Sequence, residues 1–336
     1  MINRESYIKE ELISWLLEDD NPSVRYFVLA DLLGKSINNP ELIQAKQDIL
    51  QKGIVPLILS KQKEGGYWEE KDKFYTNKYK GTVWQLIILA ESGVKASDDV
   101  RIGNACEFIL KNSQDPESYG FSIYYSTKTG GGRPGGVIPC LTGNMVFSLI
   151  RLGYLDDDRI QKAIGWITKY QRFDDGNNEK LRGWPYDQFE PCWGKHTCHM
   201  GVVKALKALA EIPPERRSHE VNITIEKAVE YLLKHHIYKK SHDLSKIAKP
   251  GWLRLGFPLM YQDDILEVLE ILTRLGHNDN RMQDAINILI SKQDKQGKWI
   301  LENTYNSRLQ VTIEKKGTPS KWLTYKTLLF LKRYYD

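Results

Sequence analysis

The sequence predicts an all-α protein whose helices form a closed double ring, an α6/α6 toroid with six inner and six outer helices. A motif of Ser-Lys-Gln followed by Gly and Trp occurs near both ends of the chain, and looser copies lie between them. Apolar segments that end in Gly also alternate with amphipathic segments that begin with small polar residues. Because these patterns continue along the whole chain, we expect one domain over residues 1–336.

The repeated motif sets the number of helical pairs. In residues 60–68 and 291–299, Ser-Lys-Gln is followed by Gly four residues later and by Trp two residues after that. Looser copies place Gln114, Gln171 and His236 at the same point, at intervals of roughly 52 to 65 residues. The chain of 336 residues therefore divides most simply into six units of about 56 residues.

The outer helices begin with residues that stabilise a helix N-terminus. Asn39 precedes Pro40, and Asp or Asn residues stand at 98–99, 156–158 and 278–279. Small polar side chains accept hydrogen bonds from the free N–H groups of a first turn, and carboxylates oppose its partial positive charge. We place the outer helices near residues 5–18, 40–62, 98–112, 157–170, 221–236 and 280–293.

The inner helices are more apolar and end in Gly, which readily adopts the left-handed conformation that closes a helix. These residues are Gly34, Gly93, Gly153 and Gly276. We place the inner helices near residues 22–34, 78–93, 141–153, 196–211, 259–276 and 320–333.

Loop lengths predict the position of the functional site. Loops from an inner to an outer helix are short, whereas loops from an outer to an inner helix are long. The long loops therefore meet at the end where the inner helices begin, and the free N–H groups of those helices favour anions there. Residues 231–260 add six Lys or Arg against one Asp at this end. The long loops cover roughly residues 63–77, 113–140, 171–195, 237–258 and 294–319.

Cysteine and histidine gather at this end. Cys140 begins the third inner helix, and Cys192, His196, Cys198 and His199 surround the start of the fourth. We expect the two histidines to share a helix face, because they are three residues apart, with Cys198 directed elsewhere.

Two thiolates and two imidazoles suit a tetrahedral zinc ion. We therefore predict zinc as a cofactor bound by Cys140, Cys192, His196 and His199, with Cys198 as a substitute for Cys192 or His199. In the alternative interpretation, the cysteines pack as small apolar residues and the histidines cap a helix. We expect Cys106, on an outer helix, to be structural.

The Gln…Gly-x-Trp copies resemble the QW motifs of the prenyltransferase and squalene-cyclase repeat superfamily across essentially the whole chain. Residues 139–145 and 193–209 look typical of a prokaryotic branch of that superfamily. Cys140 and the stretch His196-Thr197-Cys198 resemble two zinc-binding positions of the β subunit of protein prenyltransferases. The third ligand of that family, an Asp two residues before the Cys, corresponds to Ile138 here, so Cys192 or His199 would have to replace it. Arg133 is placed like the basic residues that hold diphosphate in the family.

Acidic residues supply further candidates. The Asp-x-Asp-Asp motif of class II terpene cyclases is absent, and capping explains residues 156–158. Asp263 and Asp264 open the fifth inner helix, where a desolvated carboxyl group could act as a general acid or base; a structural role at the helix start is the alternative. Asp187 and Glu190 could serve a glycan-cleaving enzyme, or they are solvated loop charges. The Gly-rich stretch 130–136 could wrap a phosphate or form a hinge.

We therefore expect a zinc-dependent enzyme, prenyltransferase-like or cyclase-like, that acts on a small apolar molecule, for example an isoprenoid, with an anionic head. The candidate substrate-binding residues are Arg133, Trp84, Asn144, Tyr261 and Trp322. A non-catalytic toroid that binds a lipid or a peptide and a carbohydrate-active toroid remain alternatives.

Composition limits the partners. A net charge of +5 gives little reason to expect nucleic acid binding. No apolar run reaches the ~18 residues of a membrane span, and residues 1–5 have no apolar core typical of a signal peptide. We expect a cytoplasmic protein, and a homodimer is an open alternative.

Overall fold

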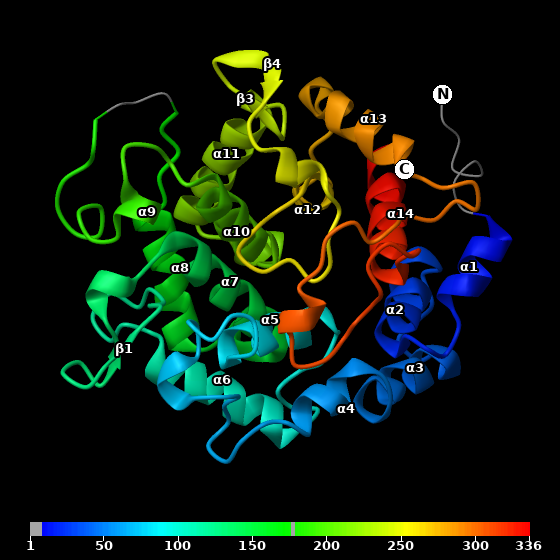
Figure 1. The fold of residues 1–336 in the computed structure, drawn as a ribbon, viewed down its shortest axis with the longest axis horizontal. Helices are drawn as coiled ribbons and strands as arrows, with labels where there is room; N and C mark the ends of the chain where they lie inside the picture. Colours follow the sequence, from blue (N-terminus) through cyan, green and yellow to red (C-terminus); the bar gives the residue numbers. More distant parts are fainter. Residues whose placement is uncertain (1–8, 176–178) are drawn as a thin grey trace.

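The computed structural model describes residues 9–175 and 179–336, and it confirms the all-α class. Figure 1 shows helices arranged around a common centre, with a second set at the periphery. The strands of the described residues form two small antiparallel ribbons: β1 (Tyr125–Ser126) with β2 (Gly131–Gly132), and β3 (Lys239–Lys240) with β4 (Asp243–Ile247). None of the helices in these residues is both long and apolar enough to span a membrane.

The central helices follow one another around the ring in chain order. Helix α5 packs against α7, α7 against α10, α10 against α12, α12 against α14, and α14 against α2. Between α2 and α5, the ring of Phe27 packs against Gly93, where an added Cβ would lie only 2.9 Å from that ring. The central helices are α2 (Pro22–Phe27), α5 (Thr82–Glu91), α7 (Pro139–Leu149), α10 (His199–Ala210), α12 (Ile265–Arg274) and α14 (Lys321–Tyr335).

Helices α3, α6, α8, α11 and α13 each pack against a central helix, and α4 packs against α3. The expected single helix at residues 40–62 is divided into two, because Gly53 adopts a φ of 73°, which an α-helix cannot contain. The peripheral helices are α1 (Glu10–Leu16), α3 (Pro40–Gln51), α4 (Ile54–Leu59), α6 (Val100–Asn112), α8 (Asp158–Tyr170), α11 (His219–Lys234) and α13 (Gln283–Ser291).

An Asp-x-Arg pattern that the sequence analysis did not use marks the start of three peripheral helical segments. Asp99, Asp157 and Asp279 are N-caps, and each accepts a 2.8 Å hydrogen bond from the backbone N–H of the Arg two residues later. The guanidinium group of that Arg also binds the capping carboxylate. Within three residues, the Asp thus caps the helix and the Arg balances the negative charge of the Asp carboxylate.

The repeated Gln and Trp residues join consecutive units. The side-chain amide of Gln62 donates to the backbone carbonyl of Arg101 at 2.8 Å, and that of Gln114 donates to the carbonyl of Arg159 at 2.9 Å. The indole N–H groups of Trp68 and Trp299 each donate at 2.8 Å to a carbonyl ten residues earlier in the chain. The motif therefore links the end of one peripheral helix to the start of the next.

Candidate functional site

Close backbone packing brings α7 and α10 together at their N-terminal ends. A Cβ added to Gly143 of α7 would lie 2.5 Å from the backbone of Lys204 in α10, and one added to Gly201 would lie 3.0 Å from Pro139. Only glycine permits this approach, since larger side chains would hold the helices apart. Cys140, in the first turn of α7, is thereby placed beside the start of α10.

Three cysteines meet at this point. Cys192 lies in the short helix α9 (Glu190–Trp193), and its thiol interacts with the thiols of both Cys140 and Cys198. Cys140 is buried, whereas Cys192 and Cys198 are partly exposed. Cys106 is fully buried on α6. Cys198, predicted from the sequence only as a substitute ligand, lies in the cluster.

His196 does not join the arrangement that the sequence suggested. Helix α10 begins at His199 with Cys198 as its N-cap, so the expectation that His196 and His199 share a helix face is wrong. His196 is exposed in the loop before the helix, and the described residues give it no hydrogen bond or ion pair. The error came from starting the helix three residues too early.

His199 and Asp263 form the polar side of the cluster. The Nε2 atom of His199 lies 3.2 Å from Oδ2 of Asp263, and the indole of Trp252 stacks on the imidazole with a centroid distance of 4.0 Å. Within residues 9–175 and 179–336, both imidazole nitrogens and Oδ1 of Asp263 are buried without an aligned hydrogen-bond partner. Such orphaned atoms are rare in stable interiors, and they often mark a site that takes a ligand.

The cluster stabilises one thiolate. A hydrogen bond from the Cys192 thiol, the backbone N–H of Gly201 and the nearby His199 lower the pKa of Cys198 to about 7, although burial opposes this shift. Contacts with Cys140 and Cys198, together with burial, raise the pKa of Cys192. Cys198 is therefore a stronger nucleophile at neutral pH than an ordinary cysteine.

Aromatic residues form a wall beside the thiols. The ring of Tyr79 lies 4.3 Å from that of Tyr305 and 5.0 Å from that of Trp84, between centroids, and Tyr261 packs at 6.3 Å from both Tyr79 and Trp84. The ring of Tyr75 lies 5.0 Å from that of Trp84, and burial followed by the neighbouring Cys140 and Cys192 raises the pKa of Tyr75, so this residue is the part of the wall beside the thiols. We call the five residues Tyr75, Tyr79, Trp84, Tyr261 and Tyr305 the aromatic wall.

Lys78 lies over this wall, with its Nζ atom 4.4 Å from the ring centroid of Tyr261 and 5.1 Å from that of Tyr75. Two members, Trp84 and Tyr261, were predicted from the sequence as substrate-binding residues. Tyr75 and Tyr305 were missed, although they stand in two of the long loops expected to form the site. Lys78 and Tyr79 were missed because the inner helix was expected from residue 78, whereas α5 begins at Thr82.

Other predicted residues have structural partners or lie at the surface. Asn144 donates to the carbonyl of Met260 at 3.0 Å, and Trp322 stacks on Phe257 at 4.3 Å. The side chain of Arg133 is exposed. Asp187 and Glu190 are also exposed, the latter 3.6 Å from Lys180.

The Gly-rich stretch has a packing explanation. Gly132 pairs with Tyr125 in the β1–β2 ribbon, and an added Cβ there would collide with the backbone carbonyl of Ser113. Glycine is needed at this position so that the ribbon can lie directly on the end of α6.

Asp264 is the N-cap of α12. Its carboxylate oxygens accept backbone hydrogen bonds of 2.9 Å from Glu267 and from Gly256. Burial nevertheless raises its pKa to about 7. At neutral pH, this group can therefore both release and take up a proton.

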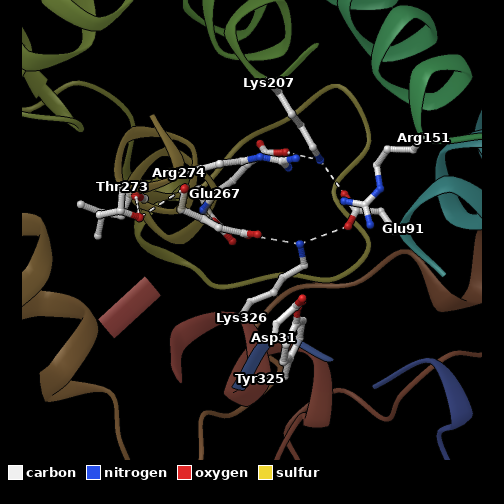
Figure 2. Close-up of polar contacts among 12 residues, drawn as sticks. Asp31, Glu91, Arg151, Lys207, Glu267, Thr273, Arg274, Tyr325 and Lys326 are labelled. Carbon is white, nitrogen blue, oxygen red and sulfur yellow. Dashed lines mark hydrogen bonds and ion pairs between the residues drawn. The ribbon is translucent and has the colours of Figure 1, made fainter. Parts of the chain in front are cut away.

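The centre of the ring carries a network of charged side chains that the sequence analysis did not predict (Figure 2). Lys207 of α10 lies 2.6 Å from Glu91 of α5 and 2.9 Å from Glu267 of α12. Lys326 of α14 lies 3.1 Å from Glu91. The sequence contained a signal, because Lys204 and Lys207, like Glu267 and Glu270, are charged residues three apart on otherwise apolar helices.

No protein-family model matches the chain, and no curated protein matches it in sequence. Among solved structures, a protein from Actinoplanes is similar over 94% of this chain and 90% of that chain, with 13% identity and a TM-score of 0.44. A type II terpene cyclase from Scytonema, in complex with its product merosterolic acid A, is similar over 87% of this chain and 99% of that chain, with 14% identity and a TM-score of 0.33. At this distance, neither structure assigns a family to the chain.

Proposed function

We propose that this chain is a zinc-dependent enzyme built on an α6/α6 toroid, and that it acts on a small, largely apolar molecule with an anionic head, such as an isoprenoid. The observation that carries the proposal is the meeting of Cys140, Cys192 and Cys198, from three separate segments, beside His199. Three thiols and an imidazole are a donor set that zinc prefers. The proposed ligands thus differ from the sequence prediction by Cys198 in place of His196.

These side chains must rotate in order to share one ion. In the described part of the chain, no three His, Cys, Asp or Glu side chains are already arranged to hold a metal. The unpartnered nitrogens of His199 are consistent with a role as ligand. Zinc bound here would stabilise a thiolate or activate a water molecule.

The surrounding residues suit the proposed substrate. The aromatic wall offers an apolar and cation-stabilising surface next to the thiols. Lys78 on this wall is positioned to hold an anionic head, a role that the sequence analysis gave to Arg133. Asp264 can exchange a proton near neutral pH, and Asp263 can orient His199.

Metal analysis of the purified protein tests the proposal. We expect near one zinc ion per chain, and loss of most of it in Cys140→Ser, Cys192→Ser and Cys198→Ser. Cys106→Ser is the matched control, because this buried cysteine lies on α6, away from the three thiols. The assignment would be overturned if metal-free wild-type protein takes up no added zinc. It would also be overturned if the three cysteine variants contain as much zinc as the wild-type protein.

A second function is favoured by the low pKa of Cys198 and by the adjacent pair of His199 and Asp263. These residues suit a metal-free thiol nucleophile that forms a covalent intermediate. In that case, iodoacetamide should modify Cys198 rapidly at pH 7, at a rate unchanged by chelator or by zinc. Protection by zinc would instead support the first proposal.

A further inference from the structure

The three thiols at the starts of α7 and α10 are close enough to react with one another. Cys192 occupies the middle position, since its thiol forms hydrogen bonds with the thiols of both Cys140 and Cys198. All four cysteines of the chain are free thiols, and the fourth, Cys106, is buried on α6. Thiols in contact can be joined by a disulfide bond when an oxidant reaches one of them.

The segment that carries Cys192 and Cys198 is anchored by other parts of the chain. The indole N–H of Trp193 donates to the backbone carbonyl of Val137 at 3.1 Å, which holds α9 against the segment before α7. The guanidinium group of Arg172 donates at 2.6 Å to a backbone carbonyl between the two cysteines. Neither contact uses a thiol, so the fold itself keeps Cys192 beside Cys198.

The members of the cluster differ in their access to solvent. Cys140 lies in the first turn of α7 and is only 5% exposed, whereas Cys192 and Cys198 are both partly exposed. A small oxidant that arrives from solvent therefore meets Cys192 and Cys198 first. An accessible cysteine with a second thiol beside it is the arrangement typical of cysteines that are oxidised reversibly.

We propose that Cys192 and Cys198 are a site of reversible oxidation, at which a hydroperoxide converts the two thiols into a disulfide. Because the Cys192 thiol donates a hydrogen bond to the Cys198 sulfur, Cys198 is the sulfur that takes an oxygen atom from the peroxide. The O–O bond breaks, and the second oxygen leaves with the Cys198 proton as water or an alcohol. The Cys192 sulfur then attacks the resulting sulfenic acid, an S–S bond forms, and the S–O bond breaks to release water with the Cys192 proton. The two thiols thus supply the two electrons that reduce the peroxide, and a dithiol reverses the change.

Oxidation of this pair would also switch the metal site off, and this consequence rests on the proposed function. A disulfide between Cys192 and Cys198 removes two of the four proposed zinc ligands and leaves Cys140 and His199. Two protein ligands are fewer than the three or four that zinc sites in proteins provide, so the ion should be released. The disulfide itself does not depend on zinc, since it needs only the two sulfur atoms and the oxidant.

Thiol mapping of the full-length, metal-free protein tests the disulfide. The native protein is treated with an equimolar amount of hydrogen peroxide, denatured in N-ethylmaleimide and mapped by mass spectrometry. We expect loss of two of the four thiols, a disulfide between Cys192 and Cys198, and recovery of both thiols with dithiothreitol. Cys106→Ser is the matched control and should form the same disulfide. Cys192→Ser should stop at a sulfenic acid on Cys198, which dimedone traps.

Four alkylated thiols after peroxide treatment, or a disulfide that joins Cys140 to Cys192, would overturn the proposed pair. This measurement on wild-type protein decides the question even if Cys192→Ser does not fold. With zinc-loaded protein, we expect one zinc ion to be released for each disulfide formed, and zinc that stays bound would refute the switch. A disulfide in a protein that binds no zinc would refute the metal site alone. Bound zinc, without any disulfide in the metal-free protein, would refute this inference alone.

Discussion

Asp264 holds its proton at pH values where an exposed aspartate has lost it, because it is buried at the start of α12. Between pH 4 and 7, the native state therefore binds a proton that the unfolded chain has released. The unfolding free energy should fall as pH rises through this interval, by at most about 1.4 kcal/mol per pH unit from this group.

Denaturant titrations at pH 5, 6 and 7 measure this slope in wild type and in Asp264→Asn. The difference between the two proteins isolates Asp264, because the other titrating groups are common to both. Glu91 and Glu267, whose pKa values are lowered, stabilise the fold above pH 4.5 and lose that contribution as the pH falls below 4.5, outside the range of these titrations. An identical slope in the variant would show that Asp264 is ionised throughout.

Gly143 determines whether the cysteines meet. A Cβ at this position would lie 2.5 Å from the Lys204 backbone, so Gly143→Ala should force α7 and α10 apart and lower the unfolding free energy by about 1–3 kcal/mol. Zinc content should fall as well. Gly165→Ala on the peripheral helix α8 is the control, because nothing lies within 4 Å of the added methyl group, and there we expect a gain of about 0.5–1 kcal/mol. Equal effects at the two glycines would contradict this account.

For single residues, the sequence predicted which side chains lie near the site better than it predicted which of them touch. It placed Cys140, Cys192 and His199 at the starts of neighbouring helices, where the structure has them. It placed His196 rather than Cys198 in the cluster, because it extended the helix over residues 196–198, which precede the helix, so that helical spacing does not relate His196 to His199. The close approach at Gly143 depends on tertiary packing, which helix periodicity does not specify.

At the scale of helices and loops, capping side chains fix where the peripheral helices begin and stabilise their first turns. Asp157→Ala should lower the unfolding free energy by about 1 kcal/mol, because the backbone N–H of Arg159 loses its acceptor. Asp158→Ala removes an exposed carboxylate from the next position without removing the cap, so it should change stability by only a few tenths of a kcal/mol. Urea unfolding compares the two, and equal losses would argue against capping as the cause.

Sequence signals for element ends were reliable where one residue type decides the conformation. The predicted caps at Asn39, Asp99 and Asp157, and the terminating Gly93, are present. The break between α3 and α4 was missed, because Gly53 lies within an otherwise continuous helical pattern. The wide turn after α7 was also missed, since π-type hydrogen bonding has no clear sequence signal.

At the scale of the whole molecule, buried ion pairs join the central helices. Glu267→Gln would leave Lys204, which is completely buried, without a carboxylate, so the unfolding free energy should fall by about 3–5 kcal/mol. Adding Lys204→Met should recover part of the loss. Glu70→Gln, which removes an exposed ion pair with Lys73, should change the unfolding free energy by less than about 1 kcal/mol. Chemical unfolding of these variants provides the test, and strictly additive losses in the double variant would refute the coupling.

The packing of α14 against α2 has a consequence for the synthesis of the chain. Lys321, at the start of α14, binds Glu18 and Asp20, so partners about 300 residues apart in sequence hold the ring closed. A nascent chain exposes the apolar side of α2 on the ribosome long before α14 has been translated. Every shortened product that lacks α14 would keep this surface open to solvent, and such products are natural substrates for chaperones and proteases.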